Sequence, residues 1–144
     1  MLELTKIFRF EMAHAIHAYE GPCSNIHGHS YTLYVTVAAV TDNNGYLPPP
    51  GFIMDFKELK SIVTESCIRK FDHQLVLSRN YSEAFGFVAR DNTIIWEYEP
   101  TAENLILHIR QALAAALPPA VQLIKLKLYE TMDSYVTWIN NGHA

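Results

Sequence analysis

Three histidines and a cysteine lie close together near the N-terminus, in a pattern typical of a catalytic metal site. His27 and His29 are separated by one glycine, so on a β-strand both imidazoles would point to the same face of the sheet. His14 ends a neighbouring apolar stretch and could complete a three-nitrogen site. Three histidines without a fourth protein ligand are typical of a catalytic zinc with an open position, although residue type also allows iron or nickel.

Cys23 separates two interpretations of such a site. As a fourth ligand it would close the coordination shell and make the metal structural. As a free thiolate beside a dication it could act as a base at neutral pH. Its position just after Gly21-Pro22 predicts a loop and argues against burial. The other cysteine, Cys67, lies in the apolar phase of an expected helix, so we interpret it as a packing residue.

Further candidates come from acidic side chains and a fourth histidine. Asp72 and His73 follow an expected helix and are either a helix end or a proton-relay pair. Glu130 continues the inward-facing series of a strand, where a buried charge needs a partner. A ligand with two adjacent N–H donors would be a bidentate partner for this carboxylate. Thr131, the next residue in the chain, is a further candidate for substrate binding. Glu103 is ambiguous, because a carboxylate in the first turn of a helix is favourable without any function.

Composition predicts a single globular domain that spans residues 1–144. The chain is 49% hydrophobic and 18% charged, with a net charge of −4, which is ordinary for a folded domain with its own core. No basic run indicates nucleic acid binding. The N-terminus lacks a signal-peptide pattern, and no apolar stretch reaches the ~20 residues of a membrane span. Two cysteines fit a reducing cytoplasm.

Periodicity predicts an α+β domain. Alternating polarity predicts strands over 4–14, 29–40, 122–130 and 135–138. In the third of these, Ile124, Leu126 and Leu128 face the core. Helices are predicted after the N-caps Asp55 and Thr101.

The remaining segments are predicted to be loops. Residues 41–52 contain Asn43, Asn44 and three prolines, and residues 74–99 are expected to be irregular apart from a short strand at 94–96. The order β-β-α-α-β-β shows no parallel crossover pattern, which favours an antiparallel sheet with two helices packed on one face.

Together these residues resemble the 6-pyruvoyltetrahydropterin synthase family, and within it the 6-carboxytetrahydropterin synthases of queuosine precursor biosynthesis. The motifs that carry the resemblance are Phe10-Glu11-Met12-Ala13-His14, Cys23-x3-His27-Gly28-His29-x-Tyr31, Met54-Asp55-Phe56, Phe71-Asp72-His73, Pro100-Thr101-Ala102-Glu103-Asn104 and Glu130-Thr131. The three residues between Cys23 and His27 are similar to the carboxy-type branch, since pyruvoyl-type members usually have a longer gap. The segment 74–99 is longer than the compact bacterial pattern.

The resemblance implies a site, a fold and an assembly. It implies zinc bound by His14, His27 and His29, a catalytic group of Cys23, Asp72 and His73, and substrate contacts from Glu130, Thr131 and Glu103. The family fold is the tunnelling fold, in which the sheets of several subunits join into a barrel. Active sites then lie at subunit interfaces of a homohexamer, a dimer of trimers. Closing the barrel would also remove exposed sheet edges.

The implied activity is that of a zinc-dependent carbon–carbon lyase in the cytoplasm. Its substrate would be 7,8-dihydroneopterin triphosphate, and its products 6-carboxy-5,6,7,8-tetrahydropterin, acetaldehyde and triphosphate. One alternative is a pyruvoyl-type synthase, which eliminates triphosphate from the same substrate. The other is a non-catalytic zinc-binding module with Cys23 as the fourth ligand. Neither nucleic acid nor membrane is an expected partner.

Overall fold

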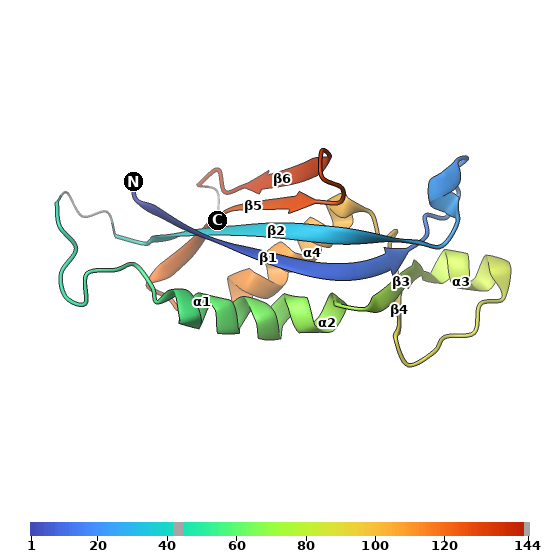
Figure 1. Ribbon diagram of the computed structural model, residues 1–144, viewed down its shortest axis with the longest axis horizontal. Helices are drawn as coiled ribbons and strands as arrows, with labels where there is room; N and C mark the ends of the chain where they lie inside the picture. The colour runs from blue at the N-terminus through green and yellow to red at the C-terminus, as the bar shows by residue number, and fades with distance from the viewer. Residues whose placement is uncertain (42–44, 143–144) are drawn as a thin grey trace.

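The computed structural model describes residues 1–41 and 45–142. Within these residues a six-stranded sheet has the strand order β4-β3-β1-β2-β5-β6, and helices cover one of its faces (Figure 1). The strands are β1 (Glu3–His14), β2 (His27–Ala39), β3 (Gln74–Ser78), β4 (Thr93–Trp96), β5 (Val121–Tyr129) and β6 (Tyr135–Ile139). No helix of these residues combines the length and apolar character needed to cross a membrane.

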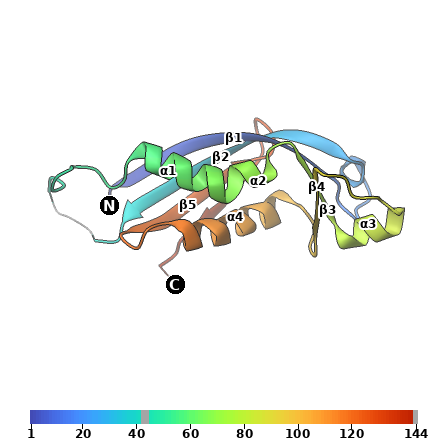
Figure 2. The same ribbon diagram turned by 90° about the horizontal axis from the view of Figure 1, so that it is seen from below.

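Two long helical segments lie side by side against the sheet (Figure 2). One runs through α1 (Phe56–Val63), a π-helical turn η2 (Thr64–Ile68) and α2 (Arg69–Phe71), and the other is α4 (Ala102–Ala116). Both predicted N-caps are confirmed. Asp55 accepts a hydrogen bond from the Lys57 amide at 2.8 Å, and Thr101 accepts one from the Asn104 amide at 3.2 Å. A cap satisfies an amide that the helix leaves unpaired, so each helix starts at a defined residue.

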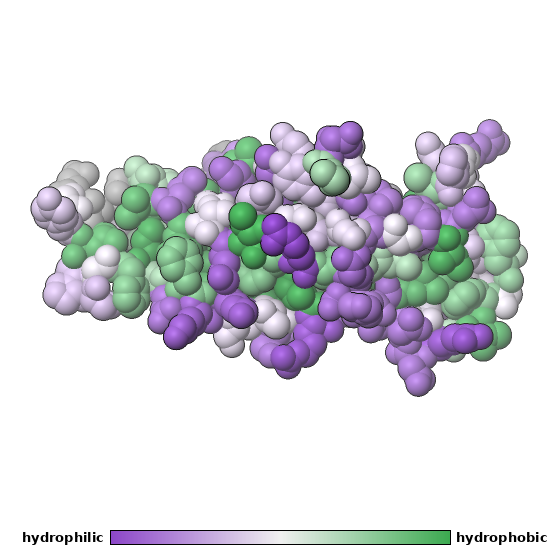
Figure 3. Space-filling model, in the orientation of Figure 1, coloured by the Kyte–Doolittle hydropathy of each residue, from purple (hydrophilic) through white to green (hydrophobic). Residues whose placement is uncertain are grey.

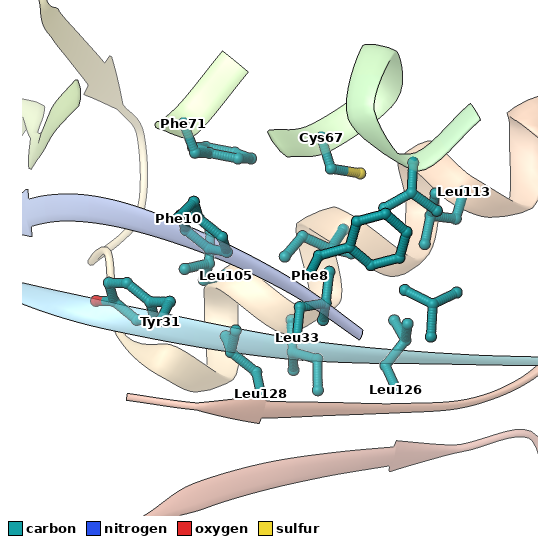
Figure 4. Packing of buried hydrophobic residues seen from close by; sticks show 14 of the residues in the cluster. Phe8, Phe10, Tyr31, Leu33, Cys67, Phe71, Leu105, Leu113, Leu126 and Leu128 are labelled. Carbon is teal, nitrogen blue, oxygen red and sulfur yellow. The ribbon is translucent and has the colours of Figure 1, made fainter. Parts of the chain in front are cut away.

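The core lies between these helices and β1, β2 and β5 (Figure 4). The predicted alternation of β1 and β2 is confirmed, because Phe8 and Phe10 are buried on the same side as Leu33. They pack with Cys67 and Phe71 of the first helical segment. Burying a side chain of this size contributes roughly 1.5–3 kcal/mol to the stability of the fold. This packing fixes the positions of the strands that carry the site residues at their ends.

The expectation that residues 74–99 are irregular is wrong. They form β3, the short helix α3 (Arg79–Phe85) and β4, and only the short strand at 94–96 was anticipated. β3 pairs in parallel with both β1 and β4, so the sheet is mixed rather than purely antiparallel. Val76, Leu77 and Ser78 are all buried, and a short strand buried on both faces shows no alternation for a sequence pattern to detect.

The inward orientation predicted for Ile124 is also wrong. Thr36 pairs with Lys125 but Val37 pairs with Leu123, so Ile124 is the extra residue of a β-bulge and Leu123 is buried in its place. A bulge shifts the alternation by one residue, which a strict period of two cannot reveal. Beyond the bulge the prediction is confirmed, because Leu126 and Leu128 are fully buried.

The other predicted elements agree with the structure. The strand at 135–138 is β6, and residues 41 and 45–52 form no helix or strand. Asp42, Asn43 and Asn44 of the predicted loop lie outside the described residues. Another short helical turn, η1 (Pro22–Ser24), lies in the loop between β1 and β2.

Candidate active site

The pairing of β1 with β2 brings the three predicted metal ligands together. His14 lies opposite His27, and Met12 lies opposite His29, so all three imidazoles gather at one end of the helix-covered face. The ring centroids are 4.6 Å apart for His14 and His27, and 4.8 Å apart for His27 and His29. One ligand atom from each ring lies within 4.8 Å of the others, a spacing that a single metal ion could bridge.

Two backbone carbonyls orient the rings. Nδ1 of His14 donates to the carbonyl oxygen of Pro100 at 2.6 Å, and Nδ1 of His27 donates to that of Asn25 at 2.6 Å. Because a carbonyl only accepts, the proton of each neutral ring stays on Nδ1 and the lone pair on Nε2. The two Nε2 atoms lie 3.1 Å apart, so their lone pairs converge where a metal ion would bind.

Burial keeps two of the three rings uncharged. It lowers the pKa of His14 and of His29 below the ordinary 6.5, even though the carboxylate of Glu130 acts in the opposite direction. Neutral imidazole is the form that binds a metal. Nε2 of His29 is buried and lies 3.1 Å from Oε1 of Glu130 without a well-directed hydrogen bond. Three converging imidazoles, two of them oriented by backbone carbonyls, therefore fit a zinc ion with an open coordination position.

Zinc retention should therefore persist well below pH 7. Protons compete with the metal for Nε2, and the lowered pKa of His14 and His29 moves this competition below about pH 6.5. In the metal-free protein the unfolded chain binds more protons than the folded one in that window, so the free energy of unfolding also falls as the pH falls. Zinc release to a chromophoric chelator, followed from about pH 7.5 to 4.5, measures this; a release midpoint above the ordinary histidine value would contradict it.

Cys23 and Glu130 line the same cavity as His14. The cavity has a volume of about 210 Å³, and its walls are His14, Ile16, Tyr19, Cys23, Thr101, Ala102, Glu103 and Glu130. Cys23 is exposed, as its loop position predicted, and it is not part of the metal-ligand cluster found in the described residues. Three of the predicted catalytic and substrate-binding residues, Cys23, Glu103 and Glu130, thus meet beside the histidines.

Asp72 and His73 are held at the edge of β1. Oδ1 of Asp72 accepts from the Glu11 amide at 2.9 Å, and the His73 amide donates to the Glu11 carbonyl at 2.6 Å. Their side chains do meet, with Nδ1 of His73 3.1 Å from Oδ1 of Asp72. His73 has a φ of 63°, a conformation that costs a non-glycine residue about 1–3 kcal/mol and is enriched at functional sites.

This pair does not join the histidine cluster of its own chain. His73 is 77% exposed and lines a cavity of about 340 Å³ that does not include Cys23 or Glu130; its walls include Ala13, Gly28 and Ser30, and Met12 and His29 line it as well. Ala13, Gly28 and Ser30 alternate with His14, His27 and His29 along β1 and β2, and successive side chains of a strand point to opposite faces. Within one chain, most of the cavity of His73 therefore lies on the face opposite the metal cluster.

Thr131 is also separate from the cavity of Cys23. Its hydroxyl donates to Oδ1 of Asp133 at 3.0 Å, in the turn between β5 and β6. Its side chain lines a cavity on the face away from the helices, together with Arg9 and Thr32. The structure therefore gives Thr131 a turn contact and a place on a different cavity from that of Cys23.

Sequence reasoning missed several contributors to the site. The carbonyl groups of Asn25 and Pro100 act through the backbone, so their residue types carry no signal. Tyr31 was named in a motif but given no role in the site; its hydroxyl points out of the hydrophobic cluster (Figure 4) and has no hydrogen-bond partner within the described residues. Burial and the nearby Glu130 raise the pKa of Tyr31, so it stays a protonated hydroxyl. Its position two residues after His29, on the same face of the strand, was the signal that could have placed Tyr31 near the site.

Comparison with known proteins identifies relatives over nearly the whole chain. The model of the family described as 6-pyruvoyl tetrahydropterin synthase matches residues 3–141. A 6-carboxy-5,6,7,8-tetrahydropterin synthase of Rickettsia bellii is 30% identical over 142 residues, covering 94% of this chain and 99% of its own. A 6-pyruvoyl tetrahydrobiopterin synthase of Pongo abelii is 32% identical over 120 residues, covering 82% of this chain and 70% of its own.

A solved structure supports the expected fold. The 6-pyruvoyl tetrahydropterin synthase of Caenorhabditis elegans superposes with a TM-score of 0.67 at 20% identity and covers 97% of this chain and 96% of its own. At that identity the likeness concerns the fold alone. The predicted α+β tunnelling fold, with helices packed on one face of the sheet, is confirmed.

Proposed function

Because the chain belongs to the 6-pyruvoyl tetrahydropterin synthase family, we propose that it is a zinc-dependent 6-carboxy-5,6,7,8-tetrahydropterin synthase. It converts 7,8-dihydroneopterin triphosphate and one water molecule to 6-carboxytetrahydropterin, acetaldehyde and triphosphate, a step toward queuosine precursors. The observation that carries the proposal is the single cavity shared by His14, Cys23 and Glu130. The name of the Rickettsia relative and the three-residue gap between Cys23 and His27 favour the carboxy-type reaction.

The histidines hold the metal, and the protein orients them. His14, His27 and His29 present one ring nitrogen each to a common point, with two rings fixed by backbone carbonyls. When bound there, zinc supplies Lewis-acid chemistry that polarises oxygen atoms of the substrate side chain. The cysteine is left out of the ligand set, so its thiol stays available for proton transfer.

Glu130 recognises the pterin ring. A pterin presents a ring N–H and an exocyclic amine side by side, and one carboxylate can accept from both. Glu130 lies at the end of β5, held by a hydrogen bond from its amide to the Ser134 carbonyl at 3.0 Å, so its position is set by the β5–β6 turn. Glu103, on the same cavity wall, provides a second polar group, while Thr131 supports the turn.

Glu130→Gln should weaken pterin binding with little change in zinc content. The amide keeps the shape of the carboxylate but loses its charge and one acceptor, which leaves a pterin donor buried without a partner at a cost of roughly 1–3 kcal/mol. Calorimetry of pterin binding to zinc-loaded protein measures the effect, with Glu103→Gln as a comparison from the same cavity. An unchanged affinity in Glu130→Gln would assign the carboxylate to the fold instead.

Proton transfer in this proposal uses Cys23 of one subunit and the Asp72–His73 pair of another. Cys23 takes a proton from the substrate side chain, His73 accepts it, and Asp72 orients His73 through their 3.1 Å contact. Loss of triphosphate and carbon–carbon cleavage follow. The pair and Cys23 line different cavities of one chain, so the proposal takes them from two copies of the chain.

The surface is suited to such an assembly. β4 and β6 are the outer strands of the sheet, and unpaired edges are templates for pairing with another chain. Phe85 and Val88, near α3, are 67% and 81% exposed, and Figure 3 shows hydrophobic residues gathered at that end of the molecule. We include a homohexamer, a dimer of trimers, in the proposal. The free thiols of Cys23 and Cys67 fit a reducing cytoplasm.

Subunit complementation tests the shared site. Cys23→Ala and His73→Ala chains should each be nearly inactive alone, because each lacks one half of every site. Mixing them under conditions that exchange subunits should restore activity, since some interfaces then combine an intact Cys23 with an intact His73. Two copies of the same variant, treated identically, are the control. No recovery in proven mixed oligomers would contradict the placement of the pair in a neighbouring site.

Product analysis tests the function itself. The zinc-loaded protein is incubated with 7,8-dihydroneopterin triphosphate and the products are identified by mass. Acetaldehyde and 6-carboxytetrahydropterin support the proposal, whereas 6-pyruvoyltetrahydropterin supports the alternative that the similarity to the Pongo protein favours. Absence of turnover, with sulfur in the first coordination shell by metal spectroscopy, would favour the zinc-binding module with Cys23 as the fourth ligand.

A further inference from the structure

One short segment contacts both the proposed metal ligand His14 and the loop that contains Cys23. Residues 99–104 lead into α4, and the Pro100 carbonyl accepts the hydrogen bond that orients His14. The side chain of the preceding residue, Glu99, contacts the loop: its Oε1 accepts from the backbone amide of His17 at 2.5 Å. His17 lies in the loop between β1 and β2 that contains Cys23.

Ile16, which precedes His17 in the chain, connects this contact to Cys23. The Ile16 amide donates to the carbonyl oxygen of Cys23 at 2.8 Å. Ile16 and His17 are adjacent, so two successive amides connect the Glu99 carboxylate to the backbone of Cys23. Two further backbone hydrogen bonds, from the Ser24 amide to Gly21 and from the Asn25 amide to Pro22, join residues within the loop and fix its shape.

Glu99 is itself firmly held. Its carbonyl oxygen accepts from Nδ2 of Asn104 at 2.9 Å, and the Asn104 amide donates to the N-cap Thr101. The anchor is therefore part of the capped start of α4, which packs on the sheet. A carboxylate that accepts from a backbone amide makes a charge-assisted hydrogen bond, roughly twice as strong as a neutral one.

We propose that Glu99 is a positioning residue for Cys23, which it holds at a set place in the cavity through His17 and Ile16. The inference rests on the proposed role of Cys23 as the base. Glu99 does not line the cavity, so it acts only through the loop. A displacement of about 1 Å at a reacting group can cost ~10²-fold in rate. Loss of this anchor should therefore lower kcat more than it raises KM.

The test compares three variants in the zinc-loaded, full-length protein. Glu99→Ala removes the acceptor, and Glu99→Gln keeps a carbonyl oxygen at the same reach. Glu97→Ala is the matched control, because Glu97 lies two residues away in an exposed ion pair with Arg79. We expect Glu99→Ala to lower kcat about 10–100-fold with KM and zinc content nearly unchanged, Glu99→Gln to recover most of kcat, and Glu97→Ala to match the unmodified protein.

A second measurement keeps the inference separate from the proposed function. The alkylation rate of Cys23 by iodoacetamide, read by peptide mass, and hydrogen exchange of the Ile16 and His17 amides report on the loop without any pterin substrate. Both should change in Glu99→Ala and stay near the unmodified values in Glu99→Gln and Glu97→Ala. If Glu99→Ala fails to fold, Glu99→Asp, which shortens the reach, is expected to show the same changes to a smaller degree.

Three results would overturn the inference. The first is a Glu99→Ala protein that matches Glu97→Ala in kcat, alkylation and exchange. The second is a Glu99→Gln protein as impaired as Glu99→Ala, because the acceptor oxygen would then not be what matters. The third is a higher KM at unchanged kcat. If the protein has no pterin synthase activity but Glu99→Ala still changes alkylation and exchange in the loop, the proposed function is refuted and the positioning role of Glu99 is supported.

Discussion

Replacing Cys23 by alanine should lower kcat by about 10²–10⁴-fold, the usual contribution of a general base, while the zinc content stays at one ion per chain. The side chain lines the cavity beside His14 but does not belong to the metal-ligand cluster. Its removal therefore takes away a proton acceptor and leaves the three nitrogens in place. Steady-state kinetics and metal analysis of the same preparation measure the two effects.

The second cysteine provides the matched control. Burial raises the pKa of the Cys67 thiol to about 12, so it stays protonated and unreactive in the core. Cys67→Ala should lower stability, because it leaves a small cavity, but it should retain both zinc and kcat. Iodoacetamide should correspondingly inactivate the protein by modifying Cys23 alone. If zinc leaves together with the Cys23 thiol, the residue is a ligand and the structural zinc module becomes the better interpretation.

His29→Ala should remove most of the bound zinc, and activity with it. Loss of one of three protein ligands should weaken metal binding by more than the 10–100-fold that is typical of changes to groups that only support a ligand. Metal analysis after dialysis and a competition titration with a chelator measure the loss. His17→Ala is the control, because the structure uses the His17 amide and gives its ring no place in the cluster.

The core should survive the His29 substitution. His29 is only half-buried at the end of β2, beyond the packed residues Tyr31 and Leu33. Its far-ultraviolet circular dichroism should therefore match that of the unmodified protein. Full zinc occupancy in His29→Ala would contradict the three-histidine site and would also remove the main support for the proposed reaction.

Local sequence patterns were sufficient to predict an element wherever neighbouring residues contain its full alternation or its N-cap. The alternation of β1 and β2 predicted a buried face with His14, His27 and His29 on it, and the strand register then places His14 opposite His27. Asp55 and Thr101 are caps that act on amides two or three residues away, so their effect is local. The exposed loop position of Cys23 followed from Gly21-Pro22 in the same way.

Only the tertiary structure decided which distant segments meet. β3 and β4 joined the edge of β1 in parallel, and the bulge at Ile124 changed which side chain faces the core. Pro100 met His14, and Asp72 and His73 were held by the backbone of Glu11 at the edge of β1, outside the cavity of Cys23. Each of these depends on strand order or on a backbone partner far along the chain. Side-chain type records what a residue can do, whereas long-range pairing determines the neighbours with which it does so.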